Sequence, residues 1–398
     1  MSPAGLRRRQ TRRKIWLNLH LYLGLSAGAI VALAGLTGAI LVFYEELQEI
    51  LNRDQIVVAV PTHPQVRSLD EMVAAADSLK PSGSRFFKVY YPRRPGLAYK
   101  LLYYASVSGE ADGDGYYLFV DPYTAQVTGR QLWHPAAGYW RRPLVSFIMQ
   151  LHYCLLLDRF GVVLVGIVSA LSLVSILTGL VLWWPSTGRF TSALACRRRA
   201  GWVRRNYDLH KLAGVLSFCV LFPVLFSGVY FNLPEPVNRV VGRFSVLTRP
   251  NAWEGIDSEK LYSEPALGRD PIGFQAAEAA VNRAYPGGRL WMLTAPTGER
   301  GVFRIAKRDA AELSGFALGY RDFAVDQYSG RLLQVYEAGR GSYGDVFLDW
   351  QWPIHSGQAL GWSGRIAVFA SGLACPLLYL TGVLRWLQKR RATHAREN

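Results

Sequence analysis

The sequence predicts a membrane protein with four transmembrane α-helices and two α+β domains outside the membrane. Four stretches lack Asp, Glu, Lys and Arg over roughly the 20 residues that a helix needs to cross a bilayer, and two long polar segments interrupt them. The two halves of the chain also resemble each other, so we expect two parallel helix-domain-helix repeats. The uncharged stretches are residues 15–44, 160–188, 212–234 and 366–384.

The composition excludes several other classes of protein. Half of the 398 residues are apolar and 19% are charged, which argues against a disordered or low-complexity chain. The four cysteines are widely separated and never stand in CxxC spacing, so the sequence indicates neither a disulfide framework nor a zinc motif. Any chemistry must therefore come from other residue types.

The distribution of charge predicts the orientation. Residues 1–14, 185–211 and 385–398 contain 18 basic and two acidic side chains, which account for the whole net charge of +16. Basic segments beside membrane helices stay on the cytoplasmic side, so both termini and the middle loop are expected there. Residues 46–159 and 235–365 are expected mostly on the far side. Because orientation explains the basic clusters, they give no reason to expect nucleic-acid binding.

These patterns divide the chain into nine segments. The first uncharged stretch is about twice as long as the apolar part of a signal peptide and has no small-residue cleavage pattern before Glu45, so it is expected to remain as an anchor. In the first half, the expected segments are a basic N-terminus at 1–14, a transmembrane helix at 15–45, an outside domain at 46–142 and an outside helix followed by a transmembrane helix at 143–186. A cytoplasmic loop at 187–206 follows. In the second half, the expected segments are a transmembrane helix at 207–233, an outside domain at 234–352, a transmembrane helix at 353–387 and a cytoplasmic tail at 388–398.

Internal repetition links the two halves. Because each half contains an even number of expected spans, both copies have the same orientation. At an offset of 190 the equivalent residues are His20 and His210, Gly24 and Gly214, Gly38 and Gly228, and Glu45 and Glu235; at an offset of 203 they are His152 and His355, Gly161 and Gly364, Thr178 and Thr381, Gly179 and Gly382, and Trp183 and Trp386. Between the helices, Arg85 matches Arg289 and Asp121 matches Asp326, at offsets of 204 and 205.

Each outside segment is expected to form a small α+β unit, with one helix followed by short strands between Gly, Pro and Asp residues. In the first unit, Ser68 and Glu71 have capping-box spacing at the head of a helix that ends near Pro81. In the second unit the helix spans about 275–284. The expected strands are 86–91, 99–107 and 116–121 in the first unit and 289–294, 301–306 and 321–326 in the second.

Four of the seven histidines occupy equivalent positions at the ends of the expected membrane helices. His20 and His210 each follow a basic cluster by five or six residues, so they should share one depth near the cytoplasmic face. His152 and His355 each precede a helix glycine by nine residues and should lie near the outer face. A bis-histidine haem needs two helices that each supply one imidazole at the same depth. The pattern therefore predicts two haems, one between His20 and His210 and one between His152 and His355.

Other interpretations of these residues stay open. A single histidine near a helix end often only forms a hydrogen bond at the membrane interface, and Met149 is an alternative axial ligand, although a methionine there more often only packs. No CxxCH sequence occurs, so any haem would be held without covalent bonds, as b-type. Arg365 is the best candidate partner for a haem propionate, and weaker candidates are Arg141, Arg142 and Arg159. The remaining histidines, expected at the surface, are His63, His134 and His394.

The residues around the four histidines resemble those of a known family. They are Leu19-His20 through Gly24 after a basic start, Leu151-His152 followed by Leu155-Leu156-Leu157, Asp208-Leu209-His210-Lys211 with Gly214, and Pro353-Ile354-His355-Ser356-Gly357 with Gly361 to Arg365. On these residues, and over nearly the whole chain, the sequence resembles the PepSY-associated transmembrane proteins, which include bacterial inner-membrane ferrisiderophore reductases of the FoxB type. The resemblance implies two periplasmic PepSY-like domains and two b-type haems, iron protoporphyrin IX, bound by the four histidines.

The resemblance also implies an activity and its partners. Electrons would cross the inner membrane and reduce ferric iron held by a siderophore in the periplasm, and ferrous iron would then be released. Longer relatives carry a fused cytoplasmic reductase domain, whereas here only a short basic tail follows Trp386. The electron donor is therefore expected to be a separate molecule, a quinol or a flavin reductase. The expected partners are a ferric siderophore, this donor and membrane lipid.

Two other functions are compatible with the sequence. A non-enzymatic PepSY-type membrane sensor or peptidase-regulating protein would bind a partner through the outside domains and contain no absorbing cofactor, but it leaves the matched depths of the histidines unexplained. A transporter built from parallel repeats has less support, because no expected helix carries an internal charge or an obvious unwound substrate site. The visible spectrum of the purified protein distinguishes the first alternative from a haem protein.

Overall fold

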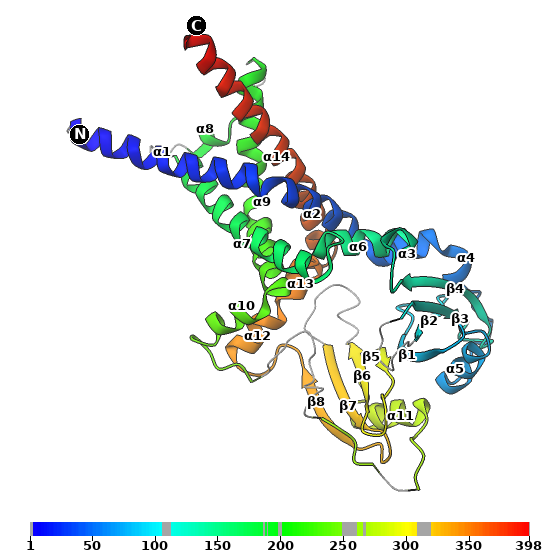
Figure 1. The fold of residues 1–398 in the computed structure, drawn as a ribbon. Helices are drawn as coiled ribbons and strands as arrows, with labels where there is room; N and C mark the ends of the chain where they lie inside the picture. Colours follow the sequence, from blue (N-terminus) through cyan, green and yellow to red (C-terminus); the bar gives the residue numbers. More distant parts are fainter. Residues whose placement is uncertain are drawn as a thin grey trace. The chain divides into compact units, whose positions relative to one another are not determined.

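The chain divides into a helical unit and a sheet unit, and each unit gathers segments from both halves of the sequence. The computed structural model describes residues 3–105, 113–185, 188, 190–197, 201–248, 261–265, 268–308 and 320–397, without the side chains of 3–9, 192 and 393–397. The helical unit comprises Met1–Phe43, Ile148–Arg239 and Gln351–Asn398, and the sheet unit comprises Tyr44–Phe147 and Val240–Trp350 (Figure 1).

The helical unit contains three helices that are long and apolar enough to cross a membrane, and a fourth candidate that is bent. The three are α7 (Asp158–Trp183), α9 (Trp202–Asn232) and α14 (Gly361–Glu397), and the bent pair is α1 (Pro3–Ser26) and α2 (Gly28–Leu41). Apolar side chains on the outside of these helices are exposed, for example Leu216 at 73% and Leu380 at 59%. Such surfaces are typical of helices that face lipid.

The first expected helix, at 15–45, differs from the structure because it is broken. α1 and α2 meet at an angle of 59°. Just before the break, the Ser26 hydroxyl donates to the Tyr22 carbonyl at 2.7 Å, and just after it Gly28 leaves room for the Tyr379 ring, which would lie 2.7 Å from a Cβ at that position. Ser and Gly neighbours of this kind are a common cause of sharp helix kinks.

Small residues allow the helices to approach closely. α1 packs against α7, α2 against α14, and α9 against both α7 and α14. Where α2 meets α14, a Cβ on Gly35 would lie 2.5 Å from Cys375 Cβ, and a Cβ on Gly372 would lie 2.6 Å from the Gly35 carbonyl oxygen. Close backbone approach at such residues is how membrane helices pack without a hydrophobic driving force.

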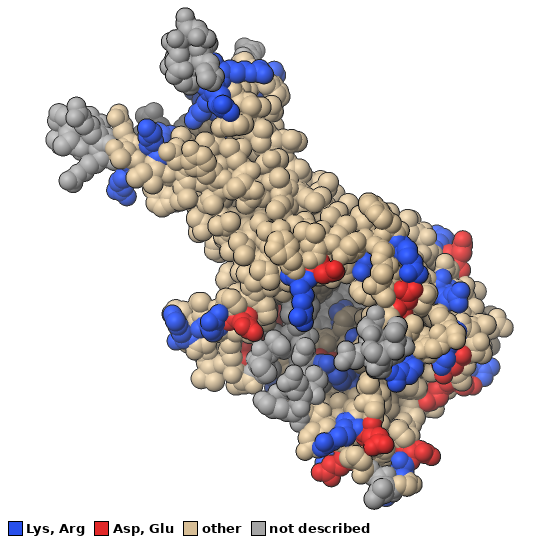
Figure 2. Space-filling model, viewed as in Figure 1, with Lys and Arg blue, Asp and Glu red and all other residues tan. Residues whose placement is uncertain are grey.

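Basic side chains gather at one end of the helical unit. Both termini lie at this end in Figure 1, and Figure 2 shows Lys and Arg concentrated there, while the rest of the visible face of the helical unit is almost free of charge. The short helix α8 (Phe190–Leu194) precedes α9, α10 (Pro234–Val241) follows it, and α6 (Leu144–Cys154) and α13 (Gln351–His355) precede α7 and α14. The 3₁₀ turn η3 (Gln358–Leu360) separates α13 from α14.

The sheet unit is built on eight antiparallel strands in the order β4-β3-β2-β1-β5-β6-β7-β8. The strands are β1 (Ser84–Tyr90), β2 (Tyr99–Ala105), β3 (Gly115–Val120), β4 (Val127–His134), β5 (Arg289–Thr294), β6 (Val302–Arg308), β7 (Tyr320–Asp326) and β8 (Leu332–Glu337). The helices of this unit are α3 (Tyr44–Leu51), α4 (Arg53–Ile56), α5 (Leu69–Asp77), η1 (Tyr139–Arg141), α11 (Phe274–Ala284) and α12 (Tyr343–Asp349).

The expected helix and three strands of each half are confirmed, including the capping box of Ser68 and Glu71 at the start of α5; residues 106 and 107, the end of one expected strand, lie outside the described residues. The sequence analysis missed the fourth strand of each half, β4 and β8. Both lack a clear alternation of apolar and polar residues; β4, for example, contains Gly129 and Arg130 at its centre.

The two expected outside domains differ from the structure because they are halves of a single sheet. β1 pairs with β5, and Val89 lies opposite Leu293. These two residues are 204 positions apart, so each pairs with its own equivalent in the other copy. Either half alone would leave this strand edge unpaired, and unpaired backbone amides and carbonyls favour pairing with another strand.

One hydrophobic core spans both halves of the sheet unit. Helices α5 and α11 pack on the same face of the sheet, where Val89, Leu101, Leu293, Ile305 and Phe323 are fully buried. The two helices are also linked directly, because the Asp70 carboxylate of α5 accepts hydrogen bonds from the backbone amides of Phe274 and Gln275, both at 2.9 Å. The first amides of a helix have no partner inside it, so Asp70 caps α11 from the other half of the chain.

Replacing Asp70 by Ala should loosen the start of α11. Loss of a helix cap costs about 1–2 kcal/mol, so the amides of residues 274–277 should exchange with deuterium roughly five to thirty times faster. Hydrogen-exchange mass spectrometry on the full chain in detergent measures this. Asp270→Ala is the matched control, because Asp270 is exposed and has no hydrogen bond or ion pair in the described part of the chain. Unchanged exchange in the Asp70 variant would contradict the assigned cap.

Candidate cofactor sites in the helical unit

The structure brings the four equivalent histidines together in two pairs. The ring centres of His20 and His210 are 6.1 Å apart, and those of His152 and His355 are 6.0 Å apart. The planes of the two rings are inclined by 78° in the first pair and by 63° in the second. These are the pairs that the sequence spacing indicates, and each consists of one residue from each half.

Each histidine is placed by a helix that belongs to its own half. His20 lies on α1 and His210 on the first third of α9. His152 and His355 lie near the ends of the short helices α6 and α13, which precede the long helices α7 and α14. All four imidazoles are half-buried within the helical unit.

The Nδ1 atom of each imidazole is held by a neighbouring helix. His20 Nδ1 lies 2.9 Å from the Ser175 carbonyl oxygen and 3.1 Å from Thr178 Oγ1. His152 Nδ1 lies 2.9 Å from the Ala34 carbonyl oxygen and 3.2 Å from Thr37 Oγ1.

The second copy repeats this arrangement. His210 Nδ1 lies 2.9 Å from Thr381 Oγ1. His355 Nδ1 lies 2.8 Å from Ser227 Oγ and 3.2 Å from the Val224 carbonyl oxygen. All four imidazoles therefore meet a buried hydroxyl group at the same ring nitrogen.

The hydroxyl groups determine which ring nitrogen carries the proton. Each hydroxyl donates to a carbonyl of its own helix: Thr178 to Ser175 at 2.6 Å, and Thr381 to Leu377 at 2.6 Å, for example. Since a hydroxyl has one proton to give, it must accept from the histidine, so Nδ1 is the donor. Nε2 is then the unprotonated nitrogen, and no hydrogen bond in the described residues involves it. An imidazole fixed at Nδ1 and free at Nε2 is typical of a histidine that ligates a metal.

A Thr-Gly or Ser-Gly dipeptide stands beside every imidazole, and the sequence analysis missed this motif as a unit. The four dipeptides are Thr37-Gly38 on α2, Thr178-Gly179 on α7, Ser227-Gly228 on α9 and Thr381-Gly382 on α14. The repeat alignment contains the matching glycines and one matching pair of threonines, so the recurrence of a hydroxyl residue before each glycine was a visible signal. Its role depends on contacts between helices, which spacing along one helix does not reveal.

The glycines make room for the rings. A Cβ on Gly38 would lie 2.9 Å from His152 Cε1, and one on Gly179 would lie 3.0 Å from His20 Cε1. At Gly382 the corresponding distance to His210 Cε1 is 3.4 Å. Any side chain at Gly38 or Gly179 would therefore push the imidazole away from its partner.

A tight left-handed turn fixes His152 and His355 relative to the long helix that follows each of them. After α6 the residues Leu155, Leu156 and Asp158 adopt φ values of 54°, 60° and 48°, which non-glycine residues rarely do. After α13 the corresponding turn contains Gly357 and Gly361, at 76° and 59°. Such strained backbone persists only where the surrounding structure enforces it, and it often occurs at functional sites.

The arrangement fits a metal that brings most of its own ligands. Among the described residues there is no group of three or more His, Cys, Asp or Glu side chains able to hold a bare ion, whereas haem iron needs only two axial ligands from the protein. Two metal-nitrogen bonds of about 2 Å, together with half the width of each ring, separate two ring centres by about 6 Å. The pairs match this separation, and the two free Nε2 nitrogens would be the donor atoms.

The other candidate residues lie away from the pairs or have partners. Arg365 donates to the Val42 carbonyl through Nη2 at 2.8 Å and packs over the rings of Phe43 and Trp362, so it binds the end of α2. Its role toward a propionate stays a prediction. Met149 lies one turn before His152 on α6.

The weaker candidates and the remaining histidines are also placed. In the sheet unit, Arg141 pairs with Asp114 at 2.9 Å, and Arg142 donates to His134 Nδ1 at 3.1 Å. Arg159 is exposed at the start of α7. The side chain of His394 lies outside the described residues.

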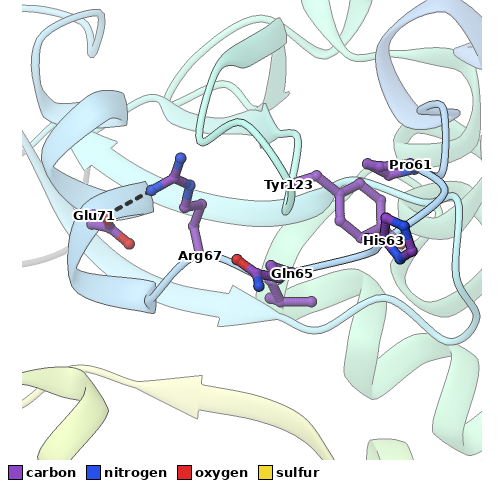
Figure 3. A pocket seen from close by; sticks show the side chains of 7 residues that line it. Pro61, His63, Gln65, Arg67, Glu71 and Tyr123 are labelled. Carbon is purple, nitrogen blue, oxygen red and sulfur yellow. Dashed lines mark ion pairs between the residues drawn. The ribbon is translucent and has the colours of Figure 1, made fainter.

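A pocket of about 350 Å³ in the sheet unit contains His63. In Figure 3 the His63, Pro61 and Tyr123 side chains lie together, while Arg67 reaches toward Glu71, 3.6 Å away. All of its lining residues come from the first half of the sheet unit. It contains none of the four paired histidines and no arrangement of nucleophile and base.

Comparison with known proteins identifies a family. A family model described as the PepSY-associated TM region matches residues 17–389 of this chain. No curated protein matches it.

Replacing Gly179 by Ala should remove one cofactor and leave the other. The added Cβ displaces His20 from His210, so the haem content expected from the sequence should fall from about two to about one per chain. Gly24→Ala is the control, because a Cβ at Gly24 has no neighbour within 4 Å. The haem content of both variants is measured by pyridine haemochrome assay on protein purified in detergent. A Gly179 variant that keeps the full haem content would contradict the expected haem between His20 and His210.

Proposed function

Because the chain belongs to the family of PepSY-associated transmembrane proteins, we propose that it is an inner-membrane electron carrier that reduces ferric siderophore iron in the periplasm. The chain is a multi-pass membrane protein with three candidate spans, or four when α1 and α2 count as one. In the proposed arrangement all four cross the bilayer, the basic end with both termini faces the cytoplasm, and the sheet unit lies in the periplasm.

The single observation that carries the proposal is the presence of two histidine pairs with free Nε2 atoms. His20 and His210 would hold one b-type haem, and His152 and His355 would hold the other. A haem bound in this way supplies a one-electron redox couple. The threonine and serine hydroxyl groups hold Nδ1, which would leave each Nε2 available to the haem iron.

Helix α9 shows that the two pairs lie at different levels. It carries His210 of the first pair, and 17 residues later Ser227, which contacts His355 of the second pair. At about 1.5 Å per residue the two levels are separated by about 25 Å along this helix. The apolar part of a bilayer is about 30 Å thick, so one pair would lie near each face.

A separate donor supplies the electrons that reduce ferric iron, so the reaction balances. A quinol or a reduced flavin gives up two electrons, one at a time, and each electron converts one ferric ion to a ferrous ion; a quinol releases its two protons in the process. The anionic oxygens of a siderophore prefer the higher charge of ferric iron, so they hold ferrous iron less tightly. Iron would then leave the chelate in the periplasm.

The visible spectrum of the purified chain tests this proposal. Before and after addition of dithionite, we expect the sharp bands of a six-coordinate b-type haem, with about two haems per chain. His20→Ala and His152→Ala should each lower the content to about one, because each removes one axial ligand from one pair. His63→Ala should leave the content unchanged, since His63 lines the pocket in the sheet unit.

Reduced protein should also convert a ferric siderophore to its ferrous form, as measured by trapping of ferrous iron with ferrozine. A colourless but correctly folded protein would overturn the proposed function and favour a membrane sensor or peptidase-regulating protein. Loss of both haems in His20→Ala, with the fold intact, would contradict the division of the histidines into these two pairs.

A further inference from the structure

Three aromatic side chains of the sheet unit are almost fully exposed. Trp140 is 88% exposed, Tyr343 92% and Phe244 87%, and these are the largest exposed fractions among the large apolar side chains that the structure describes. A single exposed leucine is ordinary on a protein surface, whereas tryptophan is highly buried on average. Exposed apolar surface of this extent is typical of a region that a membrane or another molecule covers.

Trp140 and Tyr343 occupy equivalent positions in the two copies. They are 203 positions apart, which is the offset that relates His152 to His355, and each stands 12 residues before its histidine. Because the two copies of the expected repeat have the same orientation, equivalent residues lie at the same depth relative to the membrane. Exposure that recurs at one depth in both copies indicates a shared environment there.

Both rings are carried by helical turns. Trp140 lies in η1, and its ring stacks on Phe147 with the ring centres 5.5 Å apart. Tyr343 is the first residue of α12, where Ser342 Oγ accepts from the Asp345 amide at 3.1 Å. The surrounding contacts therefore fix the backbone at the two positions and leave the outer faces of both rings uncovered.

Phe244 lies in the same region as Tyr343. Ser245 Oγ accepts from the Gly344 amide at 2.9 Å, and a Cβ on Gly344 would lie 2.7 Å from Leu247 Cδ2. Phe244 and Tyr343 each directly precede one partner of this hydrogen bond. The second copy therefore presents two exposed rings side by side.

The charge and the connections of the segment around Phe244 favour a lipid surface. Residues 236–248 contain no Asp or Glu, and Arg243 is exposed without an ion pair in the described part of the chain. A cation beside apolar rings suits the phosphate groups and acyl chains of lipids. Only 11 residues separate Phe244 from Asn232, the last residue of the candidate span α9.

From these placements we propose that Trp140, Phe244 and Tyr343 are membrane anchors, which insert into the headgroup region of the bilayer that the helical unit crosses. Trp and Tyr combine an apolar ring with a polar N–H or O–H group, and for this reason they concentrate where a membrane meets water. Trp140 anchors the first copy, and Tyr343 with Phe244 anchors the second. The inference goes beyond the proposed function, since it holds with or without a bound haem.

Hydroxyl-radical footprinting of the unchanged full-length protein in lipid nanodiscs tests the inference. The lipids are phosphatidylethanolamine and phosphatidylglycerol, and mass spectrometry measures the oxidation of each tyrosine. Tyr262 is the internal control, because it is the same residue type and is 49% exposed. Its neighbour Ser263 bonds to Gln327 after the end of β7, whereas α12 follows β8, which ends opposite the start of β7.

We expect Tyr343 to be oxidised less than Tyr262, which is the reverse of the order that their exposed fractions predict for a protein surrounded by water. Lipid over the Tyr343 ring would exclude the radical, which forms in water. Greater oxidation of Tyr343 than of Tyr262 would overturn the inference, because Tyr343 would then face water.

A photo-crosslink identifies what covers the anchors. The variants are Trp140→p-benzoylphenylalanine and Tyr343→p-benzoylphenylalanine, with Tyr262→p-benzoylphenylalanine as the control, each irradiated as the full chain in liposomes of the same two lipids. We expect lipid adducts at Trp140 and Tyr343 and none at Tyr262, as measured by mass spectrometry.

Crosslinks from Trp140 or Tyr343 to a second copy of the chain, in place of lipid adducts, would overturn the inference and show that protein covers these rings. Neither measurement depends on haem. A colourless protein with lipid adducts at both positions would overturn only the proposed function, whereas a two-haem protein without such adducts would overturn only this inference.

Discussion

The helical unit depends on one constraint: four imidazoles must each be fixed at one nitrogen and left free at the other. The hydroxyl groups of Thr37, Thr178, Ser227 and Thr381 meet this constraint, because they use their own protons on backbone carbonyls and so can only accept from Nδ1. The glycine that follows each hydroxyl residue lets the ring approach the helix. Each histidine thus contacts a hydroxyl group on a neighbouring helix of its own half, which links the helices of that half. Each histidine pair links one half to the other.

In the sheet unit, two small modules, one from each half of the chain, share a single hydrophobic core. Helices α5 and α11 share one core on the joined sheet, and pairing of β1 with β5 removes the strand edge that each module would otherwise expose. The same junction brings Lys88 of one half beside Thr294 of the other and Arg304 beyond it.

Local patterns in the sequence were sufficient for much of this structure. Uncharged length identified α7, α9 and α14, capping and turn residues identified α5 and six strands, and the repeat identified the histidine partners. Patterns along the chain did not reveal the contacts between segments. The break at Ser26 and Gly28 depends on packing of Tyr379, and a threonine in a membrane helix usually serves only its own backbone, so Thr178 gave no sign of its bond to His20.

Three of the contacts that join the halves share one property: they link equivalent residues, His20 with His210, His152 with His355, and Val89 with Leu293. Contacts between identical patches are those of an isologous homodimer. A chain of half this length would complete both histidine pairs and the sheet only by dimerising. Fusion of two such subunits would free the copies to diverge. The turns at Leu155 and Gly357 differ, and Lys88 of the first copy corresponds to Met292 of the second. A true homodimer cannot have such asymmetries.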